Sequence, residues 1–248
     1  MKKINKNRKF LVVVATHGDE AFSLPIIKKI KNQFQNEFDF IVGNPRALKE
    51  NRRFIDIDLN RVAPGKDKST LYEENRAREI MQKSKNYSFT IDIHGTVSSS
   101  DIFTIVTNPT PQNMFLAYSL PIKNVVIWGS KNNSRNTGPL SRFVDCGVGV
   151  ECGPKNKAAV KKKLENILND FISKKNTMTL GGKELYQVFG SVKKEEFKNQ
   201  RIKLKDFKQV NLNGQFFFPL LVNQYKDEGV VCYKLRKVDF YKKFSFPY

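Results

Sequence analysis

Histidine and cysteine are scarce in this sequence of 248 residues, although both residue types commonly bind metal ions. Only two histidines occur, His17 and His94, and only three cysteines, Cys146, Cys152 and Cys232. Cysteines so few and so irregularly spaced exclude a disulfide framework and a cysteine-based zinc site. We therefore expect the cysteines to be reduced, packed thiols, and a metal site to depend on the two histidines.

Long apolar runs are also absent. The longest run near the N-terminus, residues 10–15, is far shorter than the about 20 residues that a transmembrane helix needs. It follows a basic start, as the apolar part of a signal peptide does, but no small-residue cleavage site comes after it. We expect a first β-strand here, no membrane segment and a cytoplasmic protein. Internal repeats and low-complexity segments are missing as well.

Positive charge is in excess, with 44 lysines and arginines against 24 acidic residues and a net charge of +20. Such an excess is typical of nucleic-acid-binding proteins. The lysines, however, are spread along the whole chain in pairs and triplets and do not form a basic tail or an arginine-rich arm. This distribution favours a solvated basic surface over a nucleic-acid interface, and the positive field would attract small anionic substrates.

Short apolar runs alternate with segments of helical periodicity through residue 174. This alternation predicts an α/β fold with a mixed central sheet flanked by helices. The remaining sequence is rich in Phe, Val and Tyr and contains no long amphipathic helix. We predict a main domain over residues 1–176 and a small β-rich C-terminal domain over residues 177–248. The expected strands are 9–15, 38–42, 88–94, 102–107, 124–128 and 148–152, and the expected helices are 21–34, 71–83 and 158–174.

Both histidines stand at the C-terminal ends of predicted strands, where open α/β sheets place their ligand sites. Glu20 follows His17 by three residues, so the two side chains can converge on one ion where the strand turns into a helix. With His94 as a third ligand, one position stays open for water, which is typical of catalytic zinc. Asp92, two residues before His94, could instead orient a ligand. Taken alone, each histidine is more often an ordinary hydrogen-bonded polar group.

Two further segments carry polar residues suited to hydrolysis. Arg53, Asn60 and Arg61 lie in one predicted loop, where guanidinium groups could bind a substrate carboxylate or neutralise an oxyanion. The alternative is a solvated turn in a basic protein. Glu151 is the one acid in an apolar strand, and a half-buried carboxylate is costly without a function. Beside a metal it would act as general base, whereas the alternative is a structural ion pair with a lysine.

Five short segments occur in a fixed order within the first 155 residues. They are 16–20 (THGDE), 44–47 (NPRA), 53–61 (RFIDIDLNR), 92–96 (DIHGT) and 148–154 (VGVECGP). Their combination resembles the aspartoacylase and succinylglutamate desuccinylase family, a branch of the zinc-carboxypeptidase-like hydrolases. The resemblance does not extend in detail to the β-rich C-terminal region.

The resemblance implies a zinc-carboxypeptidase-like fold for the main domain, which would be the catalytic one. It implies one zinc ion bound by His17, Glu20 and His94. Glu151 would be the general base that activates water. Arg53 would polarise the scissile carbonyl and stabilise the tetrahedral oxyanion.

The resemblance also assigns four substrate-binding residues. Asn60 and Arg61 would hold a carboxylate or a neighbouring polar group. Arg142 is the arginine shortly before Glu151 that would grip a substrate carboxylate, although the stretch between the two is slightly shorter than in aspartoacylases. Tyr225 would reach the site from the C-terminal region.

These expectations define a zinc-dependent amidohydrolase that acts on a small anionic N-acyl amino acid. A metallocarboxypeptidase that cleaves a small peptide is the nearest alternative, because it would use the same ligands and general base. A basic nucleic-acid-binding protein on an inactive hydrolase scaffold is the alternative from another class. The sequence leaves open whether the chain forms a homo-oligomer.

Overall fold

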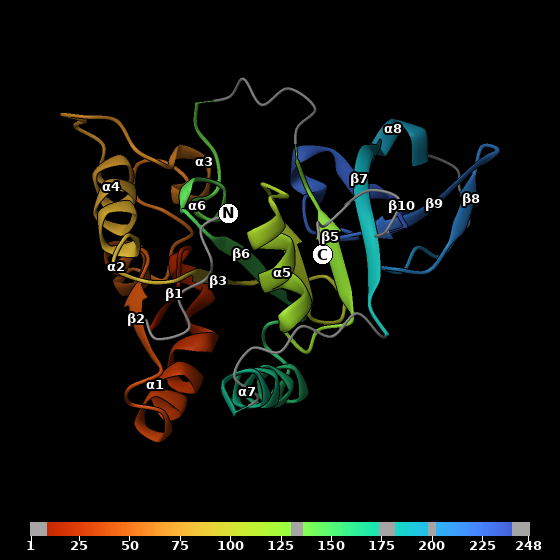
Figure 1. Cartoon of the computed structure of the whole chain (residues 1–248). Helices are drawn as coiled ribbons and strands as arrows, with labels where there is room; N and C mark the ends of the chain where they lie inside the picture. The colour runs from red at the N-terminus through yellow and green to blue at the C-terminus, as the bar shows by residue number, and fades with distance from the viewer. Residues whose placement is uncertain (1–8, 130–135, 174–181, 198–201, 240–248) are drawn as a thin grey trace.

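The computed structural model describes residues 9–129, 136–173, 182–197 and 202–239 (Figure 1). Within these residues the strands form a mixed sheet in the order β2-β1-β3-β6-β4-β5-β7-β10-β9-β8. Helices flank this sheet, so the predicted α/β fold is confirmed. The strands are β1 (Phe10–Val14), β2 (Phe38–Val42), β3 (Thr90–Gly95), β4 (Phe103–Val106), β5 (Asn124–Ile127), β6 (Gly147–Cys152), β7 (Glu184–Lys193), β8 (Val210–Leu212), β9 (Gln215–Leu220) and β10 (Val230–Lys237). The α-helices are α1 (Leu24–Gln33), α2 (Pro45–Lys49), α3 (Leu59–Val62), α4 (Tyr72–Ser84), α5 (Pro111–Ser119), α6 (Leu140–Phe143), α7 (Ala158–Ser173) and α8 (Lys194–Phe197), and the 3-10 helices are η1 (Gly18–Ser23) and η2 (Lys226–Glu228).

Side chains of β1 alternate between two apolar cores. Phe10, Val12 and Val14 are buried with α1, α5 and α7 on one face of the sheet. Leu11 and Val13 are buried with α3, α4 and α6 on the other face. A parallel strand covered on both faces needs apolar side chains at every position, which explains the unbroken apolar run in this part of the sequence.

Strands β1, β3 and β6 run parallel next to one another. Their register sets His94 of β3 directly opposite Glu151 of β6. Because parallel strands end at the same edge of a sheet, the segments that follow these three strands share one crevice. The fold therefore brings residues 15–20, 94–96 and 151–154 together.

The C-terminal strands continue the same sheet, as the blue end of Figure 1 shows. Strand β7 pairs in parallel with β5, and β10, β9 and β8 follow it in antiparallel pairs. The β-rich character expected for the C-terminal region is thus confirmed for the described residues. The predicted boundary between residues 176 and 177 lies outside the described residues, and the division into two domains stays a prediction.

The three cysteines are free and buried, as expected for packed thiols. Burial raises the pKa of the Cys146 and Cys232 thiols to about 12 in each case. Thiols with such a pKa stay protonated near neutral pH and are therefore weak nucleophiles. None of the helices in the described ranges combines the length and apolar character that a membrane span requires.

An aromatic cluster joins α7 to the sheet. The ring of Phe171, which is fully buried, makes edge contacts with Phe10 and Phe89 at centroid distances of 5.7 and 5.9 Å. We predict that Phe171→Ala lowers the free energy of unfolding by about 3–5 kcal/mol, because it leaves a cavity in this cluster. Urea denaturation measures the change. As a control, Phe216→Ala at a residue that is 65% exposed should change stability by no more than about 0.5 kcal/mol.

Candidate active site and metal centre

The segment after β1 forms an irregular turn that carries His17 and Glu20. Helix η1 begins after His17, and Glu20 departs from helical geometry with φ −108° and ψ 34°. Gly18 is required between them, because a Cβ at this position would lie 2.1 Å from the carbonyl carbon of Ala47. The regular helix expected from residue 21 therefore begins only at Leu24, after this 3-10 turn.

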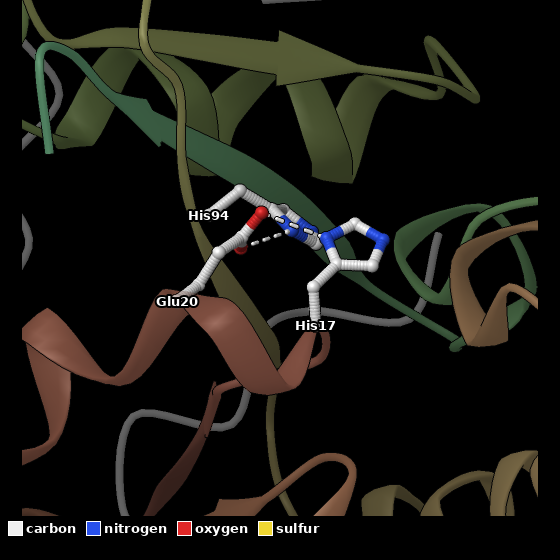
Figure 2. Close-up of side chains that lie close together, drawn as sticks. All are labelled: His17, Glu20 and His94. Atoms are coloured by element: carbon white, nitrogen blue, oxygen red, sulfur yellow. Dashed lines mark hydrogen bonds and ion pairs between the residues drawn. The ribbon is translucent and has the colours of Figure 1, made fainter. Parts of the chain in front are cut away.

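The carboxylate of Glu20 contacts both imidazole rings, as Figure 2 shows. Its Oε1 is 2.8 Å from His17 Nδ1, and its Oε2 is 3.3 Å from His94 Nδ1. One ligand atom from each of the three residues lies within 4.8 Å of the others, and all three side chains are buried. Two imidazole nitrogens and one carboxylate oxygen are a donor set that suits zinc. The three residues predicted as metal ligands thus form a cluster that could hold a metal ion.

Each imidazole ring also faces a second carboxylate through its other nitrogen. His17 Nε2 is 3.0 Å from Asp58 Oδ1. His94 Nε2 is 2.9 Å from Asp92 Oδ2, and this contact is an ion pair whose geometry does not meet that of a hydrogen bond. The other oxygen of Asp92, Oδ1, accepts a hydrogen bond of 2.7 Å from Thr16 Oγ1. Such partners fix the orientation of ligand rings, and both Nδ1 atoms contact the carboxylate of Glu20.

The charges of this cluster shift one another's pKa values in opposite directions. Burial alone would raise the pKa of Glu20 and Asp58, but the neighbouring imidazoles outweigh it and lower both. Burial alone would lower the pKa of His17 and His94, but the carboxylates around them raise both, that of His94 strongly. Without a metal ion, the cluster therefore favours protonated imidazoles between ionised carboxylates.

Asp58 connects several of the candidate residues. Besides His17, its carboxylate accepts hydrogen bonds from Arg53 Nη2 at 2.9 Å and from the backbone N–H of Asn60 at 2.8 Å. The second of these bonds caps the first turn of α3, which positions Asn60 and Arg61. Sequence reasoning did not select Asp58, because a separation of 41 residues from His17 gives no recognisable spacing.

Glu73 holds the loop that carries Arg53 and Asp58. This fully buried carboxylate accepts backbone hydrogen bonds from three consecutive residues, 55–57, at 2.7, 3.1 and 3.2 Å. It also accepts a bond of 2.9 Å from the side chain of Asn44, whose own oxygen caps α2. Glu73 was also missed, because an acid in the first turn of a helix is too common to single out.

Glu151 faces a cavity of about 530 Å³ at the ends of these strands. Burial raises the pKa of Glu151, and the nearby His94 opposes that rise. The cavity is lined by His94 and Glu151 and by the four residues predicted to bind substrate, Asn60, Arg61, Arg142 and Tyr225. Arg53 donates a hydrogen bond to Asp58, the carboxylate that also contacts His17. The structure therefore brings all nine predicted site residues into one region.

Aromatic rings form part of the wall of the cavity. Trp128 and Tyr233 meet edge to face with centroids 4.4 Å apart, and Tyr225 meets Tyr233 in the same way at 5.8 Å. All three residues line the cavity. Burial, with a further contribution from the Glu151 carboxylate, raises the pKa of Tyr225 to about 12, so its hydroxyl stays protonated and able to donate.

Solved structures of other proteins share this fold. Murine aminoacylase 3 superposes with a TM-score of 0.72 and 18% identity, over 94% of this chain and 96% of that one. Succinylglutamate desuccinylase from Chromobacterium violaceum superposes with a TM-score of 0.66 and 13% identity, over 95% of this chain and 88% of that one. At these identities the likeness establishes the fold, a mixed sheet flanked by helices.

A model of the succinylglutamate desuccinylase/aspartoacylase catalytic domain matches residues 6–173. The chain therefore belongs to this family, as its motifs predicted. The probable aspartoacylase of Acaryochloris marina is 30% identical over 168 residues, which cover 60% of this chain and 56% of that protein. The probable aspartoacylase of Trichodesmium erythraeum is 29% identical over 197 residues, which cover 69% of this chain and 66% of that protein. The first match thus spans little more than half of its relative.

We predict that the metal-free protein loses stability as the pH rises above 6.5, the ordinary pKa of histidine. A histidine whose pKa is raised by folding contributes its stability fully below the unfolded pKa and loses it as the pH rises through the folded one. Urea unfolding midpoints, measured in a chelator on both sides of pH 6.5, test this dependence. His94→Asn should reduce the slope, and midpoints that rise with pH in the unmodified protein would contradict the prediction.

Proposed function

We propose that this chain is a zinc-dependent hydrolase that cleaves the amide bond of an N-acyl amino acid. The observation that carries the proposal is a two-histidine, one-carboxylate cluster whose His94 lines one cavity together with a general-base candidate and cationic side chains. Membership of the family and the printed names of its relatives support the same activity. A cytoplasmic location, and a catalytic region over residues 1–176 followed by a β-rich region over residues 177–248, belong to this proposal.

Zinc would be held by His17 Nδ1, Glu20 and His94 Nδ1. The buried donor set fits this ion, and the carboxylates of Asp58 and Asp92 hold the two rings from behind. A bound zinc ion supplies Lewis acidity for the scissile carbonyl and for the attacking water.

Glu151 takes the proton from the attacking water and returns it to the nitrogen of the leaving amine. A general base works best when its pKa lies near the working pH, and the raised pKa of Glu151 moves it in that direction. Its position opposite His94 on the neighbouring strand keeps this carboxylate beside the cluster without making it a ligand.

Positive side chains around the cavity match an anionic substrate. Arg53 stabilises the oxyanion, and its ion pair with Asp58 fixes the guanidinium group near the metal ligands. Asn60, Arg61 and Arg142 bind the substrate carboxylate, for which guanidinium groups supply paired donors. Tyr225 donates a hydrogen bond from the aromatic wall.

We predict that Glu151→Gln lowers kcat by at least about 10²–10⁴-fold, because glutamine cannot accept the proton from water. Zinc content should stay at about one equivalent per chain, because Glu151 is outside the ligand set. Initial rates and metal analysis of the purified variant measure both. His94→Ala is the matched contrast and should lose the zinc together with the activity. An active Glu151→Gln protein would overturn the assignment of the base.

We further predict that the zinc-loaded protein prefers N-acyl amino acids to peptides with a free C-terminus, by at least about tenfold in kcat/KM. Parallel assays of the two substrate classes measure the ratio. A preference for peptides would favour the metallocarboxypeptidase instead. Absence of zinc and of hydrolysis, with tight and salt-sensitive binding of nucleic acid, would favour the nucleic-acid-binding alternative.

A further inference from the structure

The segment that carries Tyr225 into the cavity has an unfavourable backbone conformation. Leu221 and Asn223 have positive φ values of 55° and 62°, which are rare for residues other than glycine. Such conformations are energetically unfavourable and persist only where surrounding interactions hold them. Leu221 itself lines the cavity next to Tyr225. Some interaction must therefore hold the turn formed by residues 221–225.

Asp206 provides the first of these interactions. Its buried carboxylate accepts hydrogen bonds from the backbone N–H groups of Leu221 at 2.8 Å and Val222 at 3.0 Å. It also accepts a bond of 2.9 Å from the hydroxyl of Ser98, which lies four residues after His94. One carboxylate thus joins the strained turn to the loop that follows the strand of a candidate metal ligand.

Gln224 provides the second interaction, directly beside Tyr225 in the chain. Its side-chain oxygen accepts hydrogen bonds from Thr96 Oγ1 at 2.5 Å and from the backbone N–H of Val97 at 2.8 Å. The backbone N–H of Thr96 in turn donates to the carbonyl of Cys152, the residue after Glu151. Gln224 is therefore linked to the ends of both strands that carry His94 and Glu151.

We propose that Gln224 is a positioning residue, which holds the Tyr225 side chain in the cavity by tying the turn 221–225 to the loop after His94. Asp206 holds the same turn through its hydrogen bonds with the backbone N–H groups of Leu221 and Val222. The proposal rests on the function proposed above only for its kinetic consequence, because the contacts themselves do not depend on the substrate.

The test is Gln224→Ala, since Gln224 is only partly buried and its loss leaves the apolar cores intact. Removal of its oxygen should raise KM for an N-acyl amino acid about tenfold, the effect of losing about one substrate hydrogen bond. Zinc content should not change. Gln215→Ala is the matched control, because Gln215 is exposed and accepts its hydrogen bond from Lys234, away from the cavity.

A double-mutant cycle separates positioning from general destabilisation. In a Tyr225→Ala background, Gln224→Ala should have almost no further effect on KM, because the residue that it positions is gone. An equal tenfold effect in both backgrounds would overturn the proposal. A fall in kcat with unchanged KM would overturn it as well.

Hydrogen exchange gives a readout that does not depend on activity. Gln224→Ala should accelerate amide exchange in the peptides that contain Val97 and residues 221–225, whereas Gln215→Ala should not. Unchanged exchange in both peptides would overturn the proposal. If the unmodified protein hydrolyses no acyl amino acid, the proposed function fails, and the exchange result still decides whether Gln224 holds the turn.

Discussion

The parallel pairing of β1, β3 and β6 is the constraint on which the rest of the site depends. It brings the ends of three strands to one edge of the sheet and sets His94 opposite Glu151. Residues that are far apart in sequence thereby come within hydrogen-bond range without support from any local motif. The pairing itself is stable because β1 is buried on both faces, so a shift of register would move the apolar side chains of a whole strand to the wrong core.

Buried carboxylates organise the site in a chain whose net charge is +20. Glu20, Asp58 and Asp92 surround the two imidazoles, and Glu73 holds the loop behind Asp58 through backbone N–H groups. A buried carboxylate is costly unless every oxygen finds donors or charges. Glu20 shares His17 with Asp58 and His94 with Asp92, so removal of one of these acids leaves a buried imidazole with a single carboxylate partner. This sharing keeps the Nδ1 atoms of both histidines in contact with the Glu20 carboxylate.

The fold class and most of the site could be predicted from the sequence, because they depend on strong local signals. Apolar runs of strand length marked β1, β3 and β6, and the scarcity of histidine directed attention to His17 and His94. The roles of Asp58 and Glu73 could not be predicted, because they depend on contacts between residues that no spacing rule relates. The sequence predicts a regular helix from residue 21, but a 3-10 helix extends over Gly18–Ser23 and the regular helix begins at Leu24, because the close packing of Gly18 against Ala47 leaves no periodic pattern in the sequence. Assigning Tyr225 required the family resemblance, and its role remains a proposal.

The cavity is lined by two parts of the chain, and this bears on which substrate the protein takes. His94, Glu151 and Trp128 lie inside residues 6–173, the region that matches the family model. Tyr225 and Tyr233 of the aromatic wall lie beyond that region. The proposed acid–base chemistry depends closely on the distances between the reacting groups and would constrain the position of Glu151 beside His94 strongly. Binding of the acyl or amine group of a substrate depends less strictly on the position of each side chain. The part of the wall that includes Tyr225 and Tyr233 is therefore where members of one family can differ. Because the turn that carries Tyr225 contacts the loop after His94 through Gln224 and Asp206, changes in this part of the wall are coupled to the ends of β3 and β6.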